Sequence, residues 1–77
     1  MRLESDNDFE VLDYSDSRYE NLTVEIQYRG EPIAQINKEK GLRNLELEIF
    51  ANPSDSILKV PLPGFLGALI LAKGLIE

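Results

Sequence analysis

The sequence predicts an α+β domain: an antiparallel sheet of four to five strands with one C-terminal helix packed on one face. Residues 22–29 and 45–49 alternate apolar with polar side chains, as strands with one buried face do. Residues 60–76 are the only long apolar stretch outside these segments, and they contain a single charge. Because a sheet with one apolar face needs a cover, we expect this stretch to lie across it as a helix.

The 77 residues are enough for one domain, 1–77, with a small core. We expect residues 1–8, which are polar and acidic, to be loosely ordered. Residues 9–14 predict a first strand whose imperfect alternation is typical of a sheet edge, where charges discourage pairing with a second molecule. The serine and aspartate residues at 15–17 then predict a loop.

The segment from Leu22 to Arg29 is the clearest strand, because Thr, Val, Ile and Tyr are favoured on a half-buried pleated surface. Gly30 marks a hairpin to the next strand, and two loop lengths are compatible with the pattern. A two-residue loop pairs Ile26 with Ile33, whereas a three-residue loop pairs it with Ala34. The longer loop matches apolar residues at two positions, so we favour that register.

The second half of the chain predicts one further strand and the helix. Residues 45–50 form the strand, and residues 57–60 are either a short fifth strand or an extended lead-in to the helix. Residues 51–56 form a break between them. Pro63 suits a first helical turn, and we expect a helix over residues 65–76. Its apolar stripe at helical spacing consists of Phe65, Leu66, Leu69, Ala72 and Ile76.

This helix is apolar on most sides, which is typical of a helix buried on more than one side. Two interpretations remain open: a plain core helix, or a helix that also contacts a partner or a second copy. Small residues at four-residue steps let two backbones approach closely. The candidates for self-association are Gly64, Gly67, Ala68, Leu71 and Leu75. The uncharged run is too short for the about 20 residues of a membrane span, so we expect no membrane contact.

Acidic residues are concentrated at the start of the chain. Residues 1–20 hold seven acids and two bases, a net −5, and residues 21–77 hold seven acids and six bases, a net −1, which together give −6. This balance argues against nucleic-acid binding, which needs a basic surface. It is compatible with a basic protein partner or with a solvated arm that only aids solubility.

Catalysis is not expected from this composition. The chain has no Cys and no His, which excludes thiolate nucleophiles, Cys/His zinc sites and the usual proton shuttle at neutral pH. The carboxylate pairs Asp6/Asp8 and Glu46/Glu48 lack the spacing of a calcium loop, and a half-buried sheet of this size leaves little room for a substrate cleft. We therefore predict no enzyme activity, no cofactor and no metal. The acidic N-terminus lacks the pattern of a secretory leader, so we expect a cytoplasmic protein.

Several segments together resemble small bacterial immunity-type proteins, which neutralise contact-dependent or polymorphic toxins. They are residues 19–26 (YENLTVEI), the Gly30-Glu31 hairpin, 36–41 (INKEKG), 44–49 (NLELEI) and 59–62 (KVPL). The resemblance implies a helix with charges between its apolar residues. In this chain Gly67, Ala68, Ile70 and Leu71 stand there instead.

The resemblance implies a non-enzymatic protein that binds a toxin, and a nuclease toxin would be basic. The acidic surface that would meet it consists of Asp8, Glu10, Asp13, Asp16 and Glu20, together with Glu25, Glu46 and Glu48 if these share its face. Opposite charges would speed the encounter. The alternative function is a structural module that assembles into a dimer or larger homo-oligomer through its apolar C-terminal helix.

Overall fold

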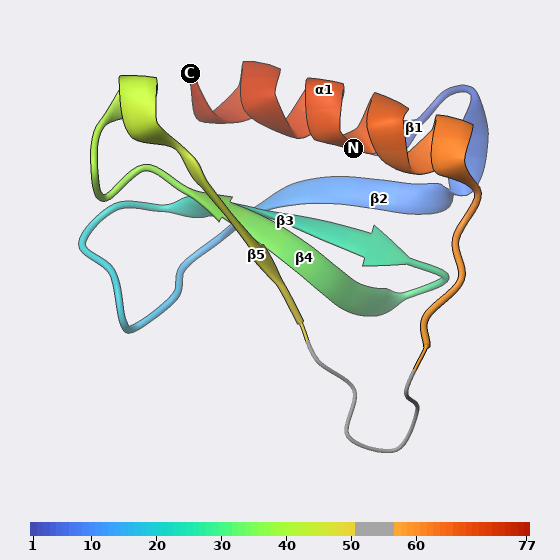
Figure 1. The fold of residues 1–77 in the computed structure, drawn as a ribbon, viewed down its shortest axis with the longest axis horizontal. Coiled ribbons are helices and arrows are strands. Elements are labelled where there is room, and N and C mark those ends of the chain that lie inside the picture. Colours follow the sequence, from blue (N-terminus) through green and yellow to red (C-terminus); the bar gives the residue numbers. More distant parts are fainter. Residues whose placement is uncertain (51–56) are drawn as a thin grey trace.

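The computed structural model describes residues 1–50 and 57–77. Within these ranges one antiparallel sheet has the strand order β1-β2-β3-β4-β5, so every strand pairs with its neighbours in sequence. The elements are β1 (Arg2–Leu3), β2 (Asp6–Tyr14), β3 (Thr23–Tyr28), β4 (Glu31–Asn37), the 3₁₀ helix η1 (Leu42–Asn44), β5 (Glu46–Ile49) and α1 (Leu62–Ile76). The helix lies across one face of the sheet (Figure 1), which confirms the predicted α+β fold.

The core lies between α1 and the central strands. Alternation along β3 directs Val24 and Ile26 to the helix side and Thr23 and Glu25 to the opposite, open face. The core side chains are Leu3, Phe9, Val11, Val24, Ile26, Ile33, Ala34, Ile36, Ala68, Ala72 and Ile76. α1 contacts β1, β2, β3 and β4 but not β5, so α1 does not cover the helix-side face of β5.

The hairpin between β3 and β4 combines features of both predicted loops. Ile26 pairs with Ala34, so the favoured register is confirmed. The turn itself contains only Arg29 and Gly30, at φ of 50° and 84°, as a primed hairpin turn requires. An irregularity in the pairing between Ile26 and Gln27 supplies the extra residue that the longer loop was expected to provide.

Residues 1–8 differ from their expected loose order. They form β1 and the start of β2, and the main chains of Met1 and Val11 exchange hydrogen bonds of 2.8 and 2.6 Å. Leu3 is buried beneath α1, where Gly67 leaves space for it. This contact between Leu3 and Gly67, 64 positions later, helps to order the segment, and the local sequence does not predict the contact.

The helix begins earlier and packs on a different line of residues than expected. It starts at Leu62, with Pro63 in the first turn as predicted. The buried line is Gly64, Ala68, Ala72 and Ile76, whereas Leu66, assigned to the stripe, is half exposed. The small residues bring the helix axis close to the sheet, whose own large side chains fill the space. Residues 57–60 are an irregular lead-in and not a strand, and the predicted break at 51–56 lies outside the described residues.

Candidate functional site

The open face of the sheet carries a hydrogen-bonded polar cluster rather than an open cleft. Residues 15–22, which we call the strap, cross this face between β2 and β3 (pale blue in Figure 1). Gln35 and Asn37 on β4 are almost fully buried, and Glu48 on β5 lies beside Gln35. The strap supplies Asp16, Arg18 and Tyr19 to the same cluster.

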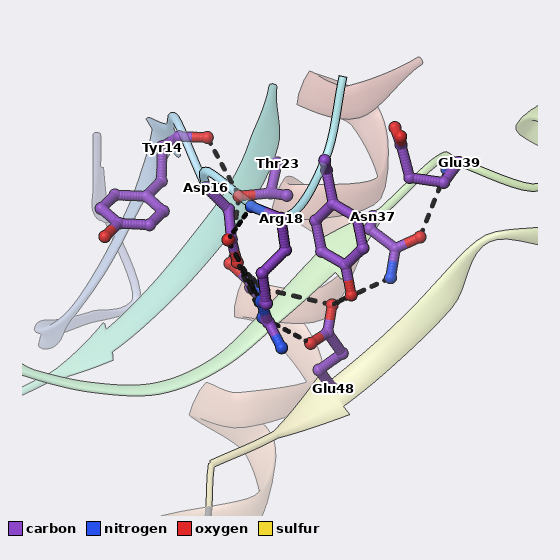
Figure 2. Close-up of polar contacts among 9 residues, drawn as sticks. Tyr14, Asp16, Arg18, Thr23, Asn37, Glu39 and Glu48 are labelled. Carbon is purple, nitrogen blue, oxygen red and sulfur yellow. Dashed lines mark hydrogen bonds and ion pairs between the residues drawn. The ribbon is translucent and has the colours of Figure 1, made fainter. Parts of the chain in front are cut away.

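Glu48 is the centre of this cluster (Figure 2). Its carboxylate accepts hydrogen bonds from Asn37 Nδ2 at 2.9 Å, the Tyr19 hydroxyl at 2.8 Å and Gln35 Nε2 at 3.2 Å. Arg18 Nη2 lies 3.0 Å from Glu48 and 2.7 Å from Asp16, so it bridges the two carboxylates. The cluster therefore fastens the strap to β4 and β5.

A second carboxylate holds the other end of the strap. Glu39 accepts hydrogen bonds from the main-chain amides of Glu20, at 2.9 Å, and Asn21, at 3.2 Å. Asn21 Nδ2 also donates to Glu39 at 2.8 Å, and Asn37 Oδ1 accepts from the amide of Glu39. In the described part of the chain no buried side-chain nitrogen or oxygen lacks a partner.

The electrostatics of the cluster favour charged carboxylates at neutral pH. Burial raises the pKa of Glu48, but hydrogen bonds from Asn37, Tyr19, Arg18 and Gln35 outweigh it and leave the pKa below its usual value. Hydrogen bonds from Arg18 and Gln35 hold the pKa of Asp16 far below normal. A general acid or base works best with a pKa near the operating pH. These shifts move away from that value and suit a structural role.

The eight predicted partner-binding acids do not form one surface. Asp8, Asp13 and Glu20 are exposed, Glu10 and Glu46 are partly covered, and Asp16, Glu25 and Glu48 serve internal contacts. Alternation along β2 places Asp13 on the helix side of the sheet and Glu10 on the open face. Besides Asp16 and Glu48, which pair with Arg18, two more of the acids are in ion pairs: Asp8 Oδ2 lies 3.3 Å from Arg29 Nε, and Glu46 Oε2 lies 3.1 Å from Lys40 Nζ.

The five self-association candidates mostly contact this chain's own sheet. Gly64 and Ala68 are buried against it, and Gly67 lies over Leu3. Leu71 is half buried and lines a shallow hollow with residues 1–5, whereas Leu75 is exposed. In this structure the small residues at four-residue steps bring helix and sheet together.

Sequence reasoning missed the apolar surface on the other side of α1. Leu62, Leu66 and Ile70 are 66%, 50% and 74% exposed and follow one another at four-residue steps, and Gly74 continues the line. We call these four residues the outer ridge. The small residues at 64, 68 and 72 were the signal that could have found it. They identify the side that can approach a sheet, and the large residues two positions away must then face outward.

The helix side of β5 carries a second group of exposed apolar side chains. Leu47 pairs with Ile36, and Ile49 with Ala34, so both lie on the helix side of the sheet, beyond the reach of α1. They are 45% and 63% exposed. The described residues contain no group of three or more acids placed to hold a metal ion. In the same residues no helix has the length and apolarity to cross a membrane.

Comparisons with protein-family models, with curated proteins and with solved structures gave no match. The functional argument therefore depends on the surfaces described above.

Proposed function

We propose that this chain is a non-enzymatic protein-binding module. The observation that carries the proposal is the exposed apolar surface of α1, where Leu62, Leu66 and Ile70 are each at least half exposed. Isolated apolar side chains are normal on a surface, but contiguous ones on a small domain mark contact sites. The polar cluster supports the same conclusion, because its carboxylates are held in their charged form by internal partners.

The most concrete form of this proposal is an immunity protein that neutralises a bacterial toxin by binding it. Support comes from the sequence resemblance and from the net charge of −6. Asp13 and Glu20 are exposed and form no ion pair with other residues in the described part of the chain. Such charges raise the rate at which a basic domain is captured and set the salt dependence of binding.

The test is binding to the toxin domain that the resemblance predicts directly upstream in the genome. We expect co-production to protect growing cells, and calorimetric titration to give a dissociation constant that rises with salt. Replacing Asp8, Asp13 and Glu20 with lysine should weaken binding and flatten its salt dependence. Asp16 is left unchanged because its replacement would release the strap and confuse binding with folding.

A matched control changes the net charge by the same amount elsewhere. Glu4 and Glu31 are also exposed, and replacing both with lysine should affect affinity much less than replacing both Asp13 and Glu20. Equal affinity for these two double variants would show that Asp13 and Glu20 are not the contact surface, and unchanged affinity of the Asp8, Asp13 and Glu20 triple variant would defeat the electrostatic model. Absence of any complex with the upstream domain would defeat the immunity function.

The outer ridge favours a second candidate function, self-assembly through α1. The acids proposed for toxin binding lie on strands and on the strap, so the two functions use different surfaces. Sedimentation of the purified chain separates them, because self-assembly needs no other protein. The two are compatible, since a dimer can still present its acidic surfaces to a toxin.

A further inference from the structure

The two long sides of α1 have opposite shapes. The side facing the sheet is formed by the small residues Gly64, Ala68 and Ala72, and side chains from the strands fill the space next to them. The outer ridge carries large exposed side chains from Leu62 to Ile70 and ends at Gly74, which has no side chain. At about 1.5 Å per residue the ridge is about 18 Å long.

Among the described residues, 1–50 and 57–77, no contact of Gly74 explains the choice of a glycine. A Cβ added there would meet no atom within 4 Å, and the residue is not among the glycines with positive φ. Glycine in a helix interior is unfavourable relative to alanine because it loses more backbone freedom on folding. A position with space and ordinary helical geometry favours a side chain unless something outside the chain comes close to it.

We propose that a second copy of this chain packs its α1 antiparallel onto the outer ridge. A two-fold axis passes midway along the ridge, between Leu66 and Ile70. Leu62 of one copy then lies over the partner's Gly74, and Leu66 packs against the partner's Ile70. The end of each ridge that carries Leu62 meets the end of the other that carries Gly74. The surface is therefore complementary to a second copy of itself, as a two-fold interface requires. Ridges of four-residue spacing pack in this way in the commonest class of helix pairs.

Charge selects a second copy over other occupants. A chain of net charge −6 repels its own copies over most of its surface, but residues 60–72 carry no charge. Lys59 and Glu77 lie nine positions on either side of the midpoint of the ridge, so antiparallel packing directs Lys59, which precedes the helix, toward the Lys73–Glu77 ion pair of the other copy. A basic toxin would gain nothing from this uncharged surface, and an acidic membrane would repel the rest of the domain.

A specific dimer needs only a small part of the surface of this chain. A specific interface needs about 500 Å² from each partner, which is less than a tenth of the 5442 Å² surface of this chain. The ridge alone is narrow. Leu47 and Ile49 are a separate exposed apolar area on the helix side of β5, a strand that α1 does not contact. This inference deepens the proposed binding role by naming the occupant of the apolar surface.

Sedimentation equilibrium of the purified chain is the first test. We expect a dimer whose dissociation constant rises at least tenfold for Leu66→Glu. Leu22→Glu is the matched control, because Leu22 on the strap is 54% exposed, close to the 50% of Leu66, and lies away from α1. The control should dimerise like the wild type. A wild-type chain that remains monomeric up to about 1 mM would overturn the proposal and leave the ridge to another protein or a lipid surface.

Cross-linking tests the antiparallel arrangement. Because the chain has no cysteine, single cysteines report on chosen pairs of positions. A mixture of the Leu62→Cys and Gly74→Cys proteins should form a mixed disulfide far faster than either protein alone. A fast Leu62→Cys homodimer would show parallel packing and overturn the arrangement. Gly74→Leu should weaken the dimer at least tenfold, with restoration by the added change Leu62→Ala. Failure of toxin binding would leave all these outcomes unaffected.

Discussion

Gly64 is the position where one added methyl group should distinguish close helix packing from a loose contact. An ideal Cβ at Gly64 would lie 2.5 Å from Phe9 Cε2 and 2.9 Å from Asp6 Oδ2. Phe9 has little freedom to move, because its ring is fully buried. The centroid of this ring lies 4.9 Å from the centroid of the Tyr28 ring and 6.5 Å from that of the Phe65 ring. In Gly64→Ala, either the helix must lift from β2 or the aromatic cluster must shift.

The expected cost follows from the two opposing effects. Overpacking by one methyl group costs about 1 to 3 kcal/mol, and the closeness of the carbon contact favours the upper end. Alanine regains at most about 1 kcal/mol of helix propensity over glycine. We therefore expect Gly64→Ala to lower the free energy of unfolding by about 2 kcal/mol, which is a melting temperature lower by about 8 to 16 °C for a domain of this size.

Gly74→Ala is the internal control, because it is the same substitution on the same helix with no neighbouring atom within 4 Å. It should stabilise the chain by up to about 1 kcal/mol. Both variants should be measured by urea unfolding in a Leu66→Glu background, since dimer formation would add a concentration-dependent contribution to stability. If Gly64→Ala proved as stable as Gly74→Ala, α1 could not lie as close to β2 as described, and the packing argument would fail.

Three further outcomes test the strap and the hairpin. Glu48→Ala should cost about 1 to 3 kcal/mol in urea unfolding, because the buried Asn37 amide loses its acceptor. The pKa values of Glu48 and Asp16 are lower in the folded chain than in the unfolded chain. The two carboxylates therefore stabilise the fold fully above their unfolded pKa values of about 4, and this contribution is lost as the pH falls through their folded pKa values. Between pH 5 and pH 2 the free energy of unfolding should therefore fall less for Glu48→Ala than for the wild type. Equal falls would contradict the structural role assigned to the Glu48 carboxylate. Gly30→Ala should cost about 1 to 2 kcal/mol by strain alone, since its φ is 84° and an added Cβ has space; an unchanged melting temperature would argue against this turn.

The fold was predictable because local patterns and global packing agree. Alternation in β3 and β5 assigned the face of each side chain, and the pairing of Ile26 with Ala34 followed from matching apolar residues. The position of Pro63 correctly indicated the first turn of α1. These features depend on neighbours close in sequence, where periodicity carries the information.

The candidate site was only partly predictable. The acids were visible by type, but whether each faces solvent depended on the strap, whose contacts join residues about 30 positions apart. Glu48 was expected at a partner surface and instead binds Asn37, Gln35, Tyr19 and Arg18. No periodic pattern encodes such a cluster, because its members are held together by the sheet register and by the path of the loop.

The sequence by itself determined the class of structure, the positions of the main strands and helix, and the absence of cysteine and histidine chemistry. Hydrophobicity did not decide which side of the mostly apolar α1 meets the sheet; the small residues at 64, 68 and 72 indicate that side, and the tertiary structure established it. A helix with nearly equal hydrophobicity all round gives no direction by its moment. The close fit of Gly64 against Phe9 and of Gly67 against Leu3 supplies that direction, and it leaves Leu62, Leu66 and Ile70 exposed on the outer side of the helix.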